Sequence, residues 1–425
     1  MKKNLQEWLS WQDSLSSKEI NLGLDRVKCV FDRLKFPRPK KIITVAGTNG
    51  KGSVVSILES ILITQGYRVG SYTSPHMHKY NERIKVNRIP VSNNKIIEAF
   101  EKIESVRCSE PLTYFEFGTL AALDILSNSY IDYLILEVGL GGRLDAVNVI
   151  DPDGSIITNI GLDHMDWLGD NREKIGYEKA GIMRHNIPTV YGEMDPPNSI
   201  KDSALDKGAD LILMGEDFIY ENSTNGLWNW QGRYDSRDNL ESSNIKGSHQ
   251  VKNVSAVLSL LESINDKELP SEKIINKAIQ GINLEGRLDQ RFYLERNWLL
   301  DVAHNHDSAR ILGNFLSKQE FRRCIFIFGI MSDKDIHKVI DEIAEYATHW
   351  FIPKLEITRS IEPNDLKKII EEKNTGSCSM NNSVAQSINM AVKSTTKNDL
   401  IVITGSFYIV SPALYYLKKT GTNGE

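Results

Sequence analysis

Cysteine and histidine are scarce in this chain of 425 residues. The four cysteines, Cys29, Cys108, Cys324 and Cys378, lie far apart and form no C-x-x-C pair. That spacing argues against a disulfide framework and against a structural zinc site. Because reduced cysteines are typical of the cytoplasm, we expect a cytoplasmic enzyme.

Long apolar runs and an excess of charge of one sign are also missing. Runs such as Cys324–Phe328 fall far below the ~18 residues of a membrane span, and Met1–Trp8 lacks the apolar segment of a signal peptide. Lysine and arginine total 51 against 56 aspartates and glutamates, a net charge of −5, which gives no general surface for polyanions. We therefore expect no membrane span, no export and no nucleic-acid partner.

The hydrophobic pattern predicts two α/β domains. Hydrophobic residues make up 40% of the chain, whose 425 residues exceed what one core usually holds. Short β-branched runs alternate with segments of helical period, which is typical of βαβ units around a parallel sheet. We place a large domain with one parallel sheet at residues 1–288 and a smaller α/β domain at residues 289–425. Strands of the large domain are expected at 41–46, 69–73, 133–138, 155–160, 187–191 and 211–213.

The chain becomes polar between residues 218 and 250. Asn225-Gly226 stands there between two aromatic runs, which predicts a β-hairpin insertion. A helix at 251–264 and a connector at 282–288 are expected to follow. The smaller domain has predicted strands at 298–302, 324–328, 349–352 and 400–403.

A glycine-rich turn follows the first predicted strand and precedes a helical segment. It reads Gly47-Thr48-Asn49-Gly50-Lys51-Gly52-Ser53. Such a turn at a helix N-terminus directs backbone N–H groups at phosphate oxygens, while Lys51 can reach the outer phosphates and Ser53 can ligate Mg²⁺. Val45 replaces the first glycine of the general P-loop pattern, and Gly52 separates Lys51 from Ser53, so the motif is a variant. An ordinary βα turn is the alternative, but the order of strand, turn and helix favours a nucleotide site.

Polar side chains at the ends of later strands point to the same edge of the sheet. Glu137 ends a buried run, where a carboxylate is costly unless it is paired or bound to a metal. It is therefore either a Mg²⁺ ligand or a partner of backbone groups or Arg143. His164 follows another strand. From the sequence alone, a lone histidine there is more often a hydrogen-bonded structural group than a metal ligand.

Several long segments resemble the folylpolyglutamate synthase family, and above all its bacterial bifunctional form, dihydrofolate synthase/folylpolyglutamate synthase. The resemblance covers nearly the whole chain and is carried by residues 44–53, 73–76, 81–84, 112–116, 136–146, 162–164, 178–182 and 301–305. It implies a P-loop domain similar to the central domain of the Mur ligases and a smaller Rossmann-like domain.

The implied reaction is amide formation driven by ATP. The γ-phosphoryl group passes to a substrate carboxylate, and the amine of L-glutamate attacks the acyl phosphate. The pterin-bearing substrate would be 7,8-dihydropteroate, a (tetrahydro)folate or both. Mg²⁺ is the implied metal, and the sequence leaves open whether a monovalent cation takes part. We expect the enzyme to be a monomer.

The resemblance also assigns roles to individual residues. Ser53, Ser74, Glu137 and His164 would hold metal, with Ser53 and Ser74 at the nucleotide-bound ion and the other two at a second position. Lys51, Lys179 and His304 would be catalytic, and the lysine that matches Lys179 is carbamylated in the family. An unmodified Lys179 paired with Glu178 or a phosphate is the alternative.

Substrate contacts are implied in both domains. The pterin would meet Leu22, Gly23, Leu112, Thr113, Tyr114, Phe115, Leu144, Asp145 and Ala146. Asn21 stands where bifunctional members carry Asp, and core packing is the alternative for the leucines and Phe115. Asn253, Arg287 and Asp301 would contact the nucleotide, although an Asp at a strand end is also a common helix cap.

Three other classes of protein are alternatives to this interpretation. The chain lacks the N-K-x-D tetrapeptide of GTPases, and a kinase would not explain the ligase segments. A folylpolyglutamate synthase without the first activity, or a Mur-type ligase for another amino acid, is a closer alternative. A non-catalytic nucleotide-binding module has little reason to keep Lys51, Glu137, His164 and Lys179 together.

Overall fold

The computed structural model describes residues 3–15, 21–223, 226–241, 247–265, 269–282, 284–373 and 375–421. Asn225 of the predicted turn and Asn283 of the predicted connector lie outside these ranges. The chain forms two compact units. The first contains residues 1–161 and 165–282, and the second contains residues 162–164 and 283–425.

An eight-stranded sheet forms the centre of the first unit, in the order β4-β3-β2-β5-β1-β6-β7-β8. Its strands are β1 (Lys41–Ala46), β2 (Val69–Tyr72), β3 (Ile84–Val86), β4 (Ile89–Pro90), β5 (Tyr133–Glu137), β6 (Gly154–Ile157), β7 (Pro188–Tyr191) and β8 (Asp210–Leu213). From β2 to β8 the strands are parallel, which confirms the predicted sheet. At one edge the sheet continues with two strands that were not predicted, β3 and β4, which pair antiparallel.

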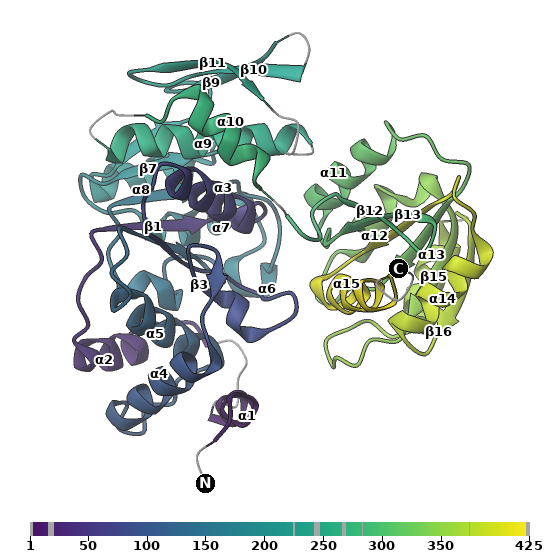
Figure 1. The fold of residues 1–425 in the computed structure, drawn as a ribbon, viewed down its shortest axis with the longest axis horizontal. Helices are drawn as coiled ribbons and strands as arrows, with labels where there is room; N and C mark the ends of the chain where they lie inside the picture. The colour runs from purple at the N-terminus through teal and green to yellow at the C-terminus, as the bar shows by residue number, and fades with distance from the viewer. Residues whose placement is uncertain are drawn as a thin grey trace. The chain divides into compact units, whose positions relative to one another are not determined.

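Helices cover both faces of this sheet, with α9 and α10 on one side and α4 and α5 on the other (Figure 1). The helices of this unit are α1 (Leu5–Leu15), α2 (Asp25–Leu34), α3 (Lys51–Thr64), α4 (Asn93–Val106), α5 (Tyr114–Ser127), α6 (Met165–Leu168), α7 (Arg172–Lys179), α8 (Asn198–Lys207), α9 (Ser248–Ile264) and α10 (Glu272–Gln280). Strand β1 has five consecutive buried residues because helices pack on both of its faces. The predicted helix at 251–264 is confirmed as part of α9.

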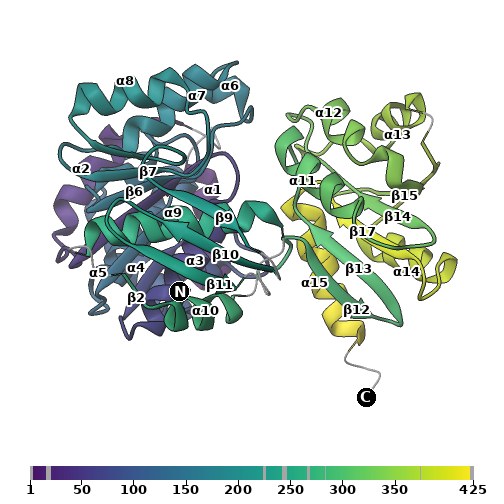
Figure 2. The ribbon, with the colours of Figure 1, turned by 90° about the horizontal axis from the view of Figure 1, so that it is seen from above.

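A separate three-stranded antiparallel sheet packs near α9 and α10 (Figure 2). Its strands are β9 (Ile219–Asn222), β10 (Leu227–Gln231) and β11 (Ser236–Glu241). Trp228, Trp230 and Leu240 are buried, whereas Gln231 is exposed, so one face is apolar and the other polar. The predicted hairpin is confirmed, and β11 extends it by a strand.

The second unit has a six-stranded sheet in the order β12-β13-β17-β14-β15-β16. Its strands are β12 (Asp289–Tyr293), β13 (Arg296–Asp301), β14 (Cys324–Phe328), β15 (Ala347–Pro353), β16 (Ser377–Asn381) and β17 (Leu400–Thr404). Its helices are α11 (His306–Leu316), α12 (Ile336–Asp341), α13 (Pro363–Glu372), α14 (Val384–Ser394) and α15 (Phe407–Gly421). Only β12 is antiparallel to its neighbour. All four predicted strands of this unit are present.

Within the described residues, none of these helices has the length and apolar character needed to cross a membrane.

Candidate active site

The phosphate loop between β1 and α3 can be formed only with glycine at its first position. Gly47 has φ +147°, and a Cβ there would lie 1.7 Å from the hydroxyl oxygen of Thr158. Gly50 has φ +84° and directly precedes α3. These two glycines let the backbone turn sharply into the helix N-terminus, where phosphate binding is favoured.

Segment 158–161, after β6, fixes the conformation of this loop. Thr158 donates its hydroxyl to the carbonyl of Asn49 at 2.6 Å, and the side-chain oxygen of Asn159 accepts from the Asn49 amide at 2.9 Å. The Thr48 hydroxyl accepts from the Gly161 amide at 3.0 Å. Thr158 and Asn159 were missed from the sequence, since nothing in their spacing connects them to a loop about 110 residues earlier.

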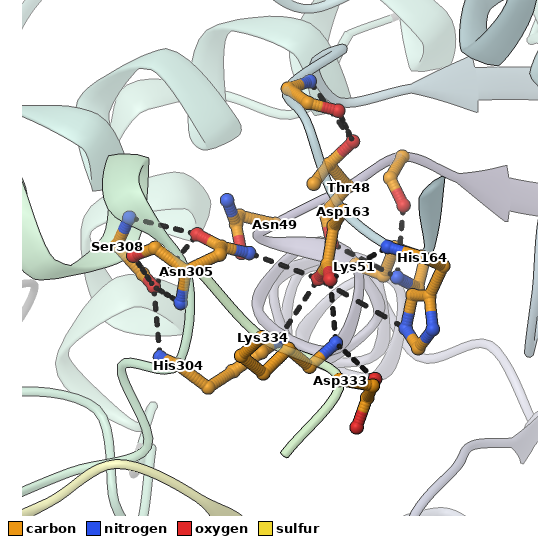
Figure 3. Close-up of polar contacts among 12 residues, drawn as sticks. Thr48, Asn49, Lys51, Asp163, His164, His304, Asn305, Ser308, Asp333 and Lys334 are labelled. Atoms are coloured by element: carbon orange, nitrogen blue, oxygen red, sulfur yellow. Dashed lines mark hydrogen bonds and ion pairs between the residues drawn. The ribbon is translucent and has the colours of Figure 1, made fainter. Parts of the chain in front are cut away.

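Lys51 folds back over its own loop. Its Nζ donates to the carbonyls of Gly47 at 2.9 Å and Thr48 at 3.2 Å (Figure 3). The ammonium group is thus held at the loop, where a phosphate chain would lie.

Glu137 lies at the C-terminal end of β5 beside the phosphate loop. A Cβ on Gly52 would be 3.8 Å from its Oε1, and its Oε2 accepts from the Ser74 amide at 3.1 Å. The Ser53 hydroxyl is buried and lies 3.4 Å from the side-chain nitrogen of Gln250. The structure therefore brings Ser53, Ser74 and Glu137 together in the first unit.

This oxygen donor set fits Mg²⁺, which prefers carboxylates and hydroxyls and retains positions for phosphate oxygens. Among the described residues, no group of three or more His, Cys, Asp or Glu side chains could by itself hold a metal ion. A magnesium ion here would therefore depend on the serine hydroxyls and the nucleotide as well as on Glu137.

Lys179, at the end of α7, is a buried lysine with 3% of its surface exposed. The carbonyls of Glu178 and Lys179 lie 2.9 Å from the Cβ that Gly142 lacks, so glycine permits this close approach. The neighbouring carboxylate, Glu178, accepts a hydrogen bond through its Oε1 from Arg143 at 2.8 Å.

Phe115, Thr113 and Asp145 are three of the residues predicted to meet the pterin. A Cβ on Gly139 would lie 2.6 Å from the Phe115 ring, and Thr113 caps α5 by accepting from the Glu116 amide. Asp145 accepts from the amides of Leu140 at 2.8 Å and Val147 at 3.0 Å. Burial raises the pKa of the Asp145 carboxyl to about 6, although these backbone N–H groups oppose the shift.

Two further predicted segments, Leu22-Gly23 and the segment of Asn253, also belong to the first unit. The Gly23 amide donates to the carbonyl of Leu144 at 3.4 Å, so the segment Leu22-Gly23 adjoins 144–146. The side-chain oxygen of Asn253 lies 3.3 Å from the Cβ position of Gly50. Leu112 is fully buried, which agrees with the core-packing alternative for that residue.

The remaining predicted residues belong to the second unit. Asp301 ends β13 and accepts from the amides of Leu288 at 2.7 Å and Ala303 at 2.8 Å. Burial raises the pKa of Asp301, against the charge of Arg287. Arg287 stacks over the ring of Phe407 at 5.2 Å.

Asp163 is the centre of a charged cluster in this unit (Figure 3). Its carboxylate pairs with Lys334, lies 3.3 Å from His304 Nε2 and accepts from the Asn305 side chain at 3.1 Å. His164 Nε2 is 4.0 Å from it. Burial alone would raise the pKa of Asp163, but the His304 hydrogen bond and the nearby positive groups hold it far below its usual range.

Lys334 and the pairing role of Asp163 were missed from the sequence. Lys334 stands in the polar segment Ser332-Asp333-Lys334-Asp335, which is typical of a solvated loop. Only 6% of its side chain is exposed. Asp163 lies in segment 162–164, which carries part of the family resemblance, but the sequence predicts a role only for its neighbour His164.

These features define a Mur-type ligase architecture: a P-loop α/β unit followed by a smaller unit with a mostly parallel sheet. Two family models match accordingly, the Mur ligase middle domain over residues 45–261 and the Mur ligase glutamate ligase domain over residues 286–407.

Curated relatives narrow this class. A dihydrofolate synthase/folylpolyglutamate synthase of Escherichia coli is 36% identical over 423 residues, which cover 99% of this chain and 97% of that protein. The protein of the same name from Bacillus subtilis is 29% identical and is covered to 99%. The chain belongs to the dihydrofolate synthase/folylpolyglutamate synthase family.

Solved structures agree over 98% of both chains. E. coli FolC in complex with DHPP and ADP superposes with a TM-score of 0.92 at 35% identity. A bifunctional folylpolyglutamate synthase/dihydrofolate synthase with Mn, AMPPNP and L-glutamate bound gives a TM-score of 0.90 at 36% identity.

Proposed function

We propose that this chain is an ATP-dependent ligase that adds L-glutamate to 7,8-dihydropteroate and to the γ-carboxylate of (tetrahydro)folates. The observation that carries the proposal is the clamped phosphate loop with Glu137 beside it, in a chain whose relatives of that name match from end to end. One similar structure holds Mn, AMPPNP and L-glutamate, which are a metal, a nucleotide and the amine substrate of such a reaction.

The chemistry divides into two steps. A carboxylate oxygen of the pterin-bearing acid attacks the γ-phosphorus of ATP, the bond to the β-phosphate oxygen breaks, and ADP leaves. The amine of glutamate then attacks the acyl phosphate carbon, loses a proton and expels inorganic phosphate. Both steps depend chiefly on positioning and on neutralising phosphate charge.

Each predicted residue has a place in this scheme. Residues 47–53 bind the phosphates, with Lys51 neutralising charge on the transferred group. Asn253, Arg287 and Asp301 contact the rest of the nucleotide. His304 of the second unit, whose Nε2 lies 3.3 Å from Asp163, is proposed to be a catalytic residue.

Metal and lysine chemistry support the transfer. Ser53 and Ser74 would hold the nucleotide-bound Mg²⁺, and Glu137 and His164 would hold a second metal ion. The bound metal offsets the negative charge of the phosphates. Lys179 is proposed to be carbamylated, since a buried carbamate would supply anionic oxygens where a buried ammonium would not.

Phosphate release tests the proposal directly. Purified protein is given ATP, Mg²⁺ and L-glutamate with either dihydropteroate or tetrahydrofolate, and phosphate is measured with and without glutamate. Glutamate-dependent release with both acids is expected. Release with tetrahydrofolate alone would remove the dihydrofolate synthase half, and release that depends on another amino acid would indicate a different Mur-type ligase.

We also propose a cellular compartment and an oligomeric state for the enzyme. The unpaired spacing of the cysteines suits a reducing compartment, so we place the enzyme in the cytoplasm. The site residues all come from one chain, so a monomer suffices for the reaction.

A further inference from the structure

Arg83 is a charged residue for which the scheme above has no use. It ends the short 3-10 helix η1 (Tyr80–Arg83). Residues 81–84 carry part of the family resemblance, but the sequence analysis assigns Arg83 no role. Its guanidinium lies 5.4 Å from the ring centre of Tyr80 and 5.4 Å from that of Tyr114. Its Nε donates to Nδ1 of His76 at 2.9 Å. The residue is partly exposed, and its cation lies against two aromatic rings.

None of the carboxylates among the described residues forms an ion pair with Arg83. The adjacent carboxylate, Glu82, is engaged elsewhere, because it accepts from the amides of Met77 at 2.8 Å, Lys79 at 2.8 Å and His78 at 3.1 Å. These three bonds fix the loop that follows Ser74 and direct Glu82 to its backbone.

The other neighbours of Arg83 are neutral. Burial raises the pKa of Tyr80 well above the usual value for tyrosine, so this phenol does not become a counter-ion. Aromatic faces attract a guanidinium but supply less than a full negative charge. A partly buried guanidinium without a counter-ion is a strong binding group for a carboxylate, which it can hold through two parallel hydrogen bonds.

The rings around Arg83 adjoin the residues expected to bind the pterin. The rings of Tyr72 and Phe115 are 6.0 Å apart, and Tyr80 and Tyr114 are 5.8 Å apart. The hydroxyls of Tyr80 and Tyr72 lie 2.6 and 3.3 Å from the Cβ position of Gly118. The neighbouring side chains therefore lead from Arg83 through Tyr80 and Tyr72 to Phe115, and from Phe115 to Gly139.

We infer that Arg83 binds the carboxylate of the pterin-bearing substrate and so sets the preference of this site for acids. The inference rests on the proposed function, since it takes the neighbouring pocket to be the pterin pocket. Arg83 is a substrate-binding residue in this view, and His76 fixes the orientation of its fork. The ring and the acid group of one ligand would then be held by separate elements of the first unit.

Binding of an acid and of its neutral counterpart tests this inference. Affinities of dihydropteroate and of its carboxamide are measured by calorimetry for the wild-type protein, Arg83→Gln and Arg83→Lys. The wild type is expected to prefer the acid at least tenfold. Arg83→Gln should bind both compounds about equally and bind the carboxamide within about twofold of wild type, while Arg83→Lys should keep part of the preference.

Arg68→Gln is the matched control, because Arg68 is an exposed arginine of the same unit whose removal changes the net charge equally. It should keep the wild-type preference. A wild type without preference, an Arg83→Gln variant that retains it, or an equal loss of both compounds in Arg83→Gln would each overturn the inference. Failure of the proposed function would instead appear as wild-type protein that releases no phosphate with glutamate.

Discussion

Lys51 and Asp163 show how differently single charges are supported in this molecule. Lys51 is held by two carbonyls of the loop it serves. Asp163 is a carboxylate with 6% of its side chain exposed, surrounded by donors from three residues of its unit. Lys51 thus contacts the backbone of its own loop, whereas Asp163 connects three side chains of the second unit.

Lys51→Ala is expected to abolish glutamate-dependent turnover while leaving the thermal melt within a few degrees of wild type. The reason is that the alanine removes the cation at the phosphates but leaves the turn of Gly47 and Gly50 intact. Phosphate release and differential scanning fluorimetry check the two halves. Retained turnover would refute the role of Lys51.

Asp163→Asn is expected to destabilise the protein by about 2–3 kcal/mol. The buried ammonium of Lys334 then loses its nearer carboxylate and keeps only that of Asp333 at 3.5 Å. Urea unfolding at pH 7 measures this loss. The double variant Asp163→Asn, Lys334→Met should recover part of the stability, since it removes both charges, but not the turnover, since His304 still lacks its partner. Equal stability of the single and double variants would contradict this account.

At the scale of elements, the strands richest in buried apolar residues were predictable, whereas some exposed or polar strands were not. Strands β1, β5, β14 and β17 consist mainly of apolar residues, and their positions follow from the sequence. Strands β4 and β16 were missed because Ile89 is exposed and Ser377–Asn381 is polar, so neither carries a hydrophobic pattern.

The candidate site divides in the same way. The phosphate loop and Glu137 could be found because glycines and a charge at a strand end are locally unusual. Lys334, Thr158 and the counter-ion-free state of Arg83 depend on which distant segments meet, and one sequence does not contain that information.

Gly47→Ala tests the loop as an element. The methyl group would meet Thr158 at 1.7 Å in a backbone conformation that favours glycine, so the loop must move. We expect a loss of about 1–3 kcal/mol in stability and a KM for ATP raised at least tenfold. Gly66→Ala is the control, because Gly66 has φ +95° but nothing within 4 Å of its Cβ position. It should lose about 1 kcal/mol and keep the wild-type KM. A similar KM in both variants would refute the clash.

At the scale of the whole molecule, each unit has its own hydrophobic core, so their stabilities can be perturbed separately. Asp399 has a fully buried side chain that accepts from Arg322 and Arg323 in the second unit. Burial would raise its pKa, but these bonds and those from Thr396 lower it far below the usual range.

Asp399→Asn should therefore cost the second unit about 1–3 kcal/mol at pH 7, because Arg322, Arg323 and Thr396 lose a buried, charged acceptor. The folded-state pKa is lowered, so the stabilisation is present above the unfolded-state pKa near 4 and is lost as the pH falls below it. Unfolding by urea at pH 7 and pH 3 should show a smaller difference between variant and wild type at pH 3. A difference that grows at pH 3 would contradict this sign.

Helix α9 joins two distant tasks. Asn253 near its start adjoins Gly50, and Glu262 near its end accepts from the backbone amides of Arg233, Tyr234 and Asp235. Asn253 and Glu262 are nine positions apart, which corresponds to about 13 Å along the helix axis. A dye attached at the exposed side chain of Gln231 would lie beside the residues that contact one end of α9, while the other end adjoins the phosphate loop. Such a dye could report nucleotide binding without occupying a ligand position.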